Sequence, residues 1–362
     1  MSLSYQPLPT GVLPGSLILG ATLIPNAVLP IFTTIASHVP ILTRLEPIFT
    51  KNSHRFKAAL LAFVVLGGVR WLNRTLSVIA HNSWRTAVPN DWDWPKEIAV
   101  VTGGSSGIGQ AVAEKLVAKG LTVAILDVQD PPDSLKDLHQ THFYKCDISK
   151  PEAIAAVADA IRNELGHPTI LINNAGIAHW CSILELSDEA LQKLFAINCF
   201  AHWYTVKQFL PDMIEHDKGH VITVASSASF IAVANASDYS SSKSAIRAFH
   251  ETLGTELKHI YDAPNVLTTA VHTEFVKTPI LKDQQAHLDK EGAFMLDTDF
   301  VADKIVDRIV SRTGGDLILP ESHSFVAGLR AWPAWLQELA RDKMGQRVRK
   351  RRAETVGVAL SE

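Results

Sequence analysis

The most constraining feature of the sequence is a glycine cluster between a β-branched run and a helical pattern. The run Ile98–Thr102 (IAVVT) is short and apolar, as a buried parallel strand is. Three glycines follow within residues 103–109, and apolar residues then recur at helical spacing over 107–119. A second β-prone run, 122–126, ends at Asp127. Together these segments predict a strand–helix–strand unit of about 30 residues with glycines at its first turn.

Strand and helix patterns continue to alternate as far as residue 319. Further strands are predicted over 141–146, 169–172, 220–225, 266–271 and 316–319, and helices over 151–165, 188–215, 239–261 and 300–311. Regular alternation predicts an α/β fold, a Rossmann-type doubly wound parallel sheet of seven strands. In such a sheet, ligands bind at the carboxyl ends of the strands.

The glycine cluster is either a phosphate-binding loop or a plain turn. Glycine allows the backbone to approach a pyrophosphate, and a helix N-terminus supplies free N–H groups and the positive end of its dipole. Asp127 comes 18 residues after Gly109, at the end of the second strand. A carboxylate in that position can bind ribose hydroxyls, so the context favours a dinucleotide site.

Motifs further along the chain strengthen this interpretation. Residues 102–109 (TGGSSGIG) and 173–176 (NNAG) follow predicted strands, 239–243 (YSSSK) opens a predicted helix, and Ser226 precedes the tyrosine by 13 residues. With these motifs, the chain resembles the short-chain dehydrogenase/reductase family over roughly residues 97–320. The resemblance is greatest to membrane-associated retinol and hydroxysteroid dehydrogenases.

The resemblance implies an oxidoreductase that uses a nicotinamide cofactor and no metal. The implied catalytic residues are Asn198, Ser226, Tyr239 and Lys243. The implied cofactor-binding residues are Gly103, Ser105, Ser106, Gly107, Ile108, Gly109, Asp127, Asp147, Ile148, Asn174, Ala175, Gly176, Lys207, Val276 and Thr278, together with Tyr239 and Lys243. The family's Pro-Gly before the threonine is absent here, where the segment 273–278 reads TEFVKT.

The proposed chemistry fits these residue types. A free tyrosine has a pKa of about 10, which is high for a base near neutrality. Tyr239 and Lys243 share a helix face at i and i+4, so the ammonium is expected to lower the tyrosine pKa. Ser226 can donate a hydrogen bond to the substrate oxygen, and Asn198 can hold a water that relays protons.

The predicted cofactor is NAD(H), with NADP(H) as the alternative. Asp127 repels a 2′-phosphate and can accept a hydrogen bond from a 2′-hydroxyl. No Arg or Lys lies within residues 103–109 to compensate that charge.

The first 95 residues read as a membrane-associating segment and linker. Residues 1–43 contain no Asp, Glu, Lys or Arg, and the part 11–43 is long enough to span a bilayer but carries four prolines. The apolar run 58–69 is shorter and has Lys and Arg on both sides, which suits an interfacial helix. Packing on the soluble domain is the alternative. We expect the catalytic domain, residues 96–320, to face the cytosol from the endoplasmic reticulum or a lipid droplet.

The expected substrate is a lipophilic alcohol or ketone of sterol, retinoid or long-chain type. Apolar residues occur in 279–298, where the family has a mobile lid, and His179, Trp180 and Phe230 follow strand ends as pocket or packing residues. The net charge of −3 argues against a nucleic-acid partner. The resemblance implies a homodimer, and residues 321–362 read as an amphipathic, basic tail. A catalytically silent membrane scaffold is the alternative function.

Overall fold

The computed structural model describes residues 5–7, 53–89, 91–282, 284–290 and 292–356. The chain divides into two compact units, Pro7–Thr86 and a larger one of Met1–Gln6 with Ala87–Glu362. The predicted membrane segment 11–43 lies outside the described residues.

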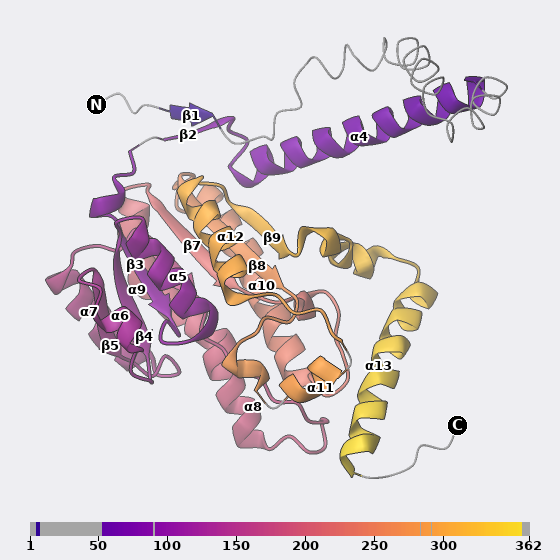
Figure 1. The fold of residues 1–362 in the computed structure, drawn as a ribbon. Coiled ribbons are helices and arrows are strands. Elements are labelled where there is room, and N and C mark those ends of the chain that lie inside the picture. The colour runs from indigo at the N-terminus through magenta and orange to yellow at the C-terminus, as the bar shows by residue number, and fades with distance from the viewer. Residues whose placement is uncertain (1–4, 8–52, 90, 283, 291, 357–362) are drawn as a thin grey trace, which may run out of the picture. The chain divides into compact units, whose positions relative to one another are not determined.

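The larger unit is built on a seven-stranded sheet in which every pair of neighbours is parallel (Figure 1). The order is β5-β4-β3-β6-β7-β8-β9, so the chain reverses direction across the sheet between β3 and β6. This confirms the predicted Rossmann-type fold and places its switch point at that pair. The strands are β3 Ile98–Thr102, β4 Thr122–Asp127, β5 Thr141–Lys145, β6 Ile170–Asn173, β7 Gly219–Val224, β8 Val266–Thr273 and β9 Gly315–Leu319.

Helices cover both faces of the sheet. Alternate residues of each strand point to opposite faces, so Val101 packs with α5 and α12 while Val100 packs with α7, α9 and α10. Because both faces are buried, the central strands are almost wholly apolar. The principal helices are α5 Gly107–Ala118, α7 Pro151–Glu164, α9 Ala201–Glu215, α10 Ser237–His259 and α12 Thr298–Val310, with the shorter α6 Asp133–Lys136, α8 Asp188–Phe195 and α11 Gln285–Lys290.

The predicted continuous helix 188–215 is wrong at its centre. A π-helical turn, η2 Ala196–Phe200, separates α8 from α9. The cause is Asn198, whose Oδ1 accepts from the Ile177 N–H at 2.8 Å and whose Nδ2 donates to the Ile177 carbonyl at 2.8 Å. These two hydrogen bonds hold the Asn198 side chain toward the segment after β6. Such π-helical turns occur often at functional sites.

The smaller unit is described by the helix α4 Ser53–His81, which contains the predicted apolar run 58–69. Several of its large apolar side chains are exposed, among them Leu66 and Val69. None of the helices in the described ranges is both long and apolar enough to cross a membrane.

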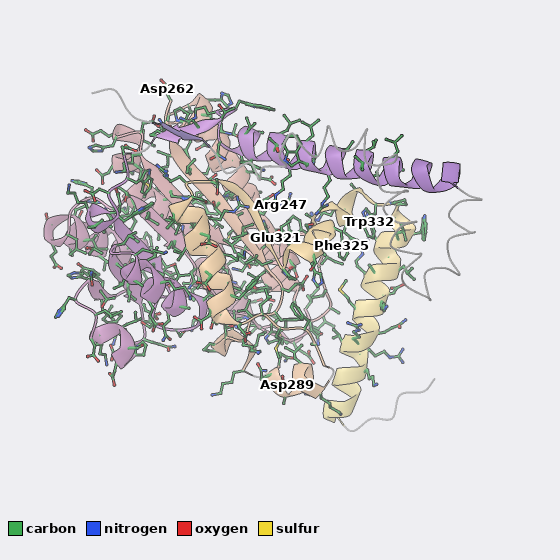
Figure 2. The ribbon with its side chains drawn as sticks, turned by 45° about the horizontal axis from the view of Figure 1, so that its top comes forward. Arg247, Asp262, Asp289, Glu321, Phe325 and Trp332 are labelled. Atoms are coloured by element: carbon green, nitrogen blue, oxygen red, sulfur yellow. The ribbon has the colours of Figure 1, made fainter. Side chains whose placement is uncertain are left out.

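After β9 the chain forms η5 Glu321–Ala331 and then α13 Ala334–Val356. Phe325 and Trp332, labelled in Figure 2, stack with ring centroids 6.4 Å apart, and Trp335 and Leu339 are exposed beyond them. As far as residue 356, where the described part ends, this tail is thus largely helical, with apolar side chains exposed on its surface.

The chain that leads into β3 is anchored by a buried ion pair. The carboxylate of Glu97 is 3% exposed and lies 2.7 Å from the ammonium of Lys218, which follows α9. It also accepts from Thr169 Oγ1 at 2.7 Å and from the Asp93 N–H at 3.0 Å. Lys218 in turn lies over the ring of Trp92.

Replacing Lys218 by methionine is expected to destabilise the protein by about 2–4 kcal/mol, because Glu97 is left as a buried charge without its cation. Urea unfolding of the full chain measures the change. The matched control is Lys136→Met, which removes an exposed pair with Asp133 and is expected to cost less than about 1 kcal/mol. Equal losses for both variants would contradict the prediction, and adding Glu97→Gln to Lys218→Met should restore most of the stability.

Candidate active site

The predicted phosphate loop joins β3 to α5 at the carboxyl edge of the sheet. Gly103 has φ +64° and Gly107 has φ +56°, a conformation that side chains other than glycine rarely adopt. Gly109 is confined by its neighbours, since a Cβ there would overlap the Gly103 carbonyl oxygen and lie 2.5 Å from Asn174 Nδ2. The N-terminus of α5 therefore approaches the loop with bare backbone, which fits a dinucleotide phosphate.

Asp127 lies at the end of β4 and holds this loop. One carboxylate oxygen accepts from the Ser105 N–H at 3.0 Å, and the other accepts from the Gln129 N–H at 3.0 Å. Ser105 Oγ also donates to the Gln129 carbonyl at 2.8 Å. The carboxylate thus stands beside the glycine turn, where the sequence predicted a ribose contact.

The NNAG segment braces the loop from the neighbouring strand β6. Asn174 Nδ2 donates to the carbonyls of Thr102 at 3.0 Å and Gly103 at 3.1 Å. Thr102 Oγ1 accepts from the N–H groups of Asn174 and Ala175 at 3.0 and 3.2 Å. Asn173 Oδ1 accepts from Thr205 of α9 at 2.8 Å. These bonds fix the relative position of β3, β6 and α9 at the switch point.

The four predicted catalytic residues gather at the same edge. Lys243, one turn after Tyr239 on α10, is buried and donates from Nζ to the Val224 carbonyl at 2.8 Å. Its Nζ lies 5.6 Å from the centroid of the Tyr239 ring. A Cβ placed on Gly176 would be 3.4 Å from Asn198 Oδ1 and 3.7 Å from Lys243 Nζ. Asn198 and Lys243 therefore flank the same glycine.

The pKa of Tyr239 departs from the expectation drawn from sequence. Burial raises it, and the hydrogen bond from Ser226 acts in the opposite direction. Burial also lowers the pKa of Lys243 to about 8, and its ammonium is directed to a backbone carbonyl. The predicted lowering of the Tyr239 pKa is therefore wrong, because burial raises the pKa by more than the Ser226 hydrogen bond lowers it.

Four further cofactor candidates come from other segments of the chain. Thr278 packs against the glycine loop, 3.2 Å from where a Cβ of Gly107 would stand, even though the family's Pro-Gly is missing. Val276 is buried beside it. Asp147 follows β5, and its pKa is lowered chiefly by the Ser149 hydroxyl, which donates to it at 2.7 Å. The Lys207 ammonium, exposed on α9, has no polar partner in the part of the chain that the structure describes.

For Phe230 the sequence left pocket lining and ordinary packing open, and the structure shows packing, because the ring is buried against the ring of His272 and the guanidinium of Arg247.

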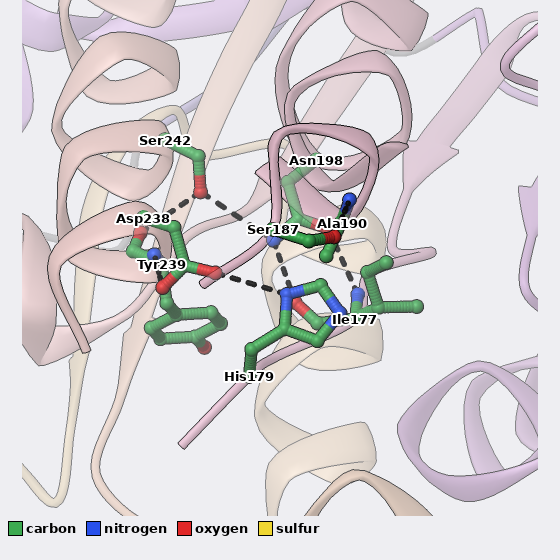
Figure 3. Close-up of polar contacts among 8 residues, drawn as sticks. All are labelled: Ile177, His179, Ser187, Ala190, Asn198, Asp238, Tyr239 and Ser242. Atoms are coloured by element: carbon green, nitrogen blue, oxygen red, sulfur yellow. Dashed lines mark hydrogen bonds and ion pairs between the residues drawn. The ribbon is translucent and has the colours of Figure 1, made fainter. Parts of the chain in front are cut away.

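One detail of the site was not predicted. Asp238, the residue before Tyr239, is buried and its carboxylate lies 3.0 Å from His179 Nδ1 (Figure 3). An acidic residue next to the motif tyrosine was the available signal for Asp238.

Comparison with known proteins identifies the family. The family model for short chain dehydrogenase matches residues 97–289. The chain belongs to the short-chain dehydrogenase family, and it is an oxidoreductase acting on alcohol or ketone groups.

Its relatives share the catalytic domain. Dehydrogenase RED2 of Cochliobolus heterostrophus is 38% identical over 208 residues, which cover 58% of this chain and 78% of that protein. Retinol dehydrogenase 10-B of Xenopus laevis is 29% identical over 236 residues, covering 57% of this chain and 69% of that protein. Short-chain dehydrogenase/reductase family 16C member 6 of Bos taurus is 33% identical over 189 residues, covering 50% and 60%.

Among solved structures, a short-chain dehydrogenase/reductase from Burkholderia phymatum in complex with NAD superposes with a TM-score of 0.61 and 23% identity. The match covers 67% of this chain and 95% of that one. This similarity concerns the fold, which in this family binds a nicotinamide cofactor.

Proposed function

We propose that the protein moves a hydride between a nicotinamide cofactor and a lipophilic alcohol or ketone, with Tyr239 as the acid or base. The observation that carries this proposal is the placement of Ser226, Tyr239, Lys243 and Asn198 at one strand edge, next to a glycine loop shaped for phosphate. A bound nicotinamide cofactor supplies the redox chemistry.

The protein's own residues manage the proton. In alcohol oxidation Tyr239 takes the hydroxyl proton, and in ketone reduction it returns one. Ser226 Oγ donates a hydrogen bond to the substrate oxygen as charge develops there. Lys243 and Asn198, which flank Gly176, pass the proton onward through water. Gly103, Gly107, Gly109 and Asp127 hold the cofactor.

We propose NAD(H) as the preferred cofactor because the Asp127 carboxylate stands at the end of β4 beside the loop. Titration of the full chain in detergent with NADH and NADPH tests this, for wild type and Asp127→Ala. Wild type should bind NADH more tightly. Asp127 also holds the loop, so the variant is expected to bind both nucleotides more weakly. The readout is therefore the ratio of the NADH affinity to the NADPH affinity, which should fall about tenfold. A wild-type preference for NADPH would overturn the assignment.

The lipophilic substrate is proposed from the surface near the site and from the relatives named retinol dehydrogenases. Ile183 and Leu184, after β6, and Phe294, after β8, are exposed apolar side chains in segments that leave the catalytic edge. We also propose that the protein associates with the membrane of the endoplasmic reticulum or a lipid droplet, that the catalytic domain spans residues 96–320, and that two copies pair through α9 and α10. The exposed Phe200 and Trp203 support that dimer face.

Ser226→Ala is expected to shift the pH profile of alcohol oxidation to higher pH. The Ser226 hydroxyl lowers the pKa of Tyr239, so its removal raises that pKa and less phenolate exists at neutral pH. The measurement is kcat/KM against pH from neutral to alkaline solution, with Ser244→Ala on α10 as the control. A lower rate with an unmoved profile would contradict the stated role.

A further inference from the structure

A buried carboxylate holds a histidine at the substrate edge of the site. Asp238 lies in the first turn of α10, and its side chain is 2% exposed. One oxygen accepts from the Tyr239 N–H at 2.8 Å, and the other lies 3.0 Å from His179 Nδ1 (Figure 3). His179 comes from the segment after β6, so the pair joins this segment to the helix that carries the tyrosine.

The pair determines which imidazole nitrogen carries the proton. An ionised carboxylate can only accept, so His179 Nδ1 must be the donor. In the neutral ring, Nε2 is then an acceptor. Nε2 has no hydrogen-bond partner among the residues that the structure describes, and the side chain is 30% exposed. The protein thus presents an oriented acceptor at this edge.

The neighbouring residue, Trp180, shows that this segment borders the site. The Trp180 ring lies 6.2 Å from the Tyr239 ring, which places the segment beside the catalytic tyrosine. The Trp180 indole N–H is buried and lacks a partner in the described part of the chain. In the proposed reaction Ser226 and Tyr239 bind the reacting oxygen, so the partly exposed Nε2 of His179 is left for a second polar group of the substrate.

We propose that His179 accepts a hydrogen bond from a second hydroxyl group of the substrate, and that Asp238 is the positioning residue that fixes its tautomer. The proposal rests on the proposed function and narrows it: the preferred substrate is a lipophilic alcohol with a further hydroxyl near the reacting carbon. A hydroxyl suits the site because it donates to Nε2, whereas an ether or carbonyl oxygen cannot.

The first test reads the tautomer without activity. In the full chain labelled with ¹⁵N-histidine, His179→Phe identifies the His179 signals, and wild type should show a protonated Nδ1 and an unprotonated Nε2. Asp238→Asn should reverse this, because the amide can donate to Nδ1. Adding decane-2,4-diol to the NADH-bound protein should shift the Nε2 resonance, while decan-2-ol should not. A protonated Nε2 in wild type, or no response to the diol, overturns the proposal.

The second test uses turnover of the same two alcohols with NAD⁺. Wild type should favour the diol, and His179→Phe should lower kcat/KM for the diol about tenfold while leaving decan-2-ol within about twofold. Asp238→Asn should move the preference toward 4-methoxydecan-2-ol, because its methoxy oxygen can only accept a hydrogen bond. Equal losses for both alcohols in His179→Phe would show a structural role and overturn the proposal. An Nε2 response to the diol without turnover of either alcohol supports the subsite and contradicts the proposed reaction.

Discussion

Tyr239→Phe is expected to reduce kcat/KM by about 10²–10⁴-fold while NADH binding stays unchanged. The substitution removes one oxygen atom from α10 and leaves the ring beside Trp180 and Lys243. The other groups near the reacting oxygen are poor replacements. Ser226 is a weak acid, and Lys243 is directed to the Val224 carbonyl. Neither of these two residues can then take the alcohol proton as Tyr239 does.

The control for this variant is Tyr204→Phe, which makes the same chemical change on α9, at a side chain that packs against the hydrophobic core and is not among the four proposed catalytic residues. Initial rates with decan-2-ol and NAD⁺, together with NADH titration, separate loss of chemistry from loss of binding. Tyr204→Phe should keep wild-type rates. A Tyr239→Phe variant that keeps more than about a tenth of wild-type activity would contradict general acid–base catalysis by this residue.

Much of the fold could be predicted because its signals are local. Each strand of the sheet is a short apolar run between polar turns, and the predicted bounds of β3 agree with the structure. The glycine loop could be placed because it follows a strand and opens a helix. Thr278 packs against Gly107 even though the family's Pro-Gly is absent, so this contact does not require those two residues.

The parts that could not be predicted depend on contacts distant in sequence. The π-helical turn exists because Asn198 binds the backbone of Ile177, 21 residues earlier. The partner of Asp238 is His179, 59 residues earlier, and neither residue belongs to a motif. The pKa of Tyr239 depends on the balance between desolvation and hydrogen bonding, which requires the burial of the hydroxyl to be known.

Gly109→Ala is expected to weaken NADH binding by at least about 100-fold and to destabilise the protein by about 1–3 kcal/mol. The new Cβ would overlap the Gly103 carbonyl oxygen and lie 2.5 Å from Asn174 Nδ2. Both are held in place, since Asn174 donates to Thr102 and Gly103 and the Gly103 N–H donates to the Leu126 carbonyl. Relief therefore requires α5 to move away from the loop that it supports.

The matched control is Gly345→Ala on α13, where a Cβ would meet no atom within 4 Å. Removing a helical glycine in open space should stabilise by up to about 1 kcal/mol and leave NADH binding unchanged. Thermal unfolding and NADH titration of both variants measure the two effects. Alanine also favours the helix at Gly109, so a net loss of stability in Gly109→Ala must come from the overlap of its Cβ with the loop. Normal NADH affinity in Gly109→Ala would show that the approach of α5 to the loop does not determine cofactor binding.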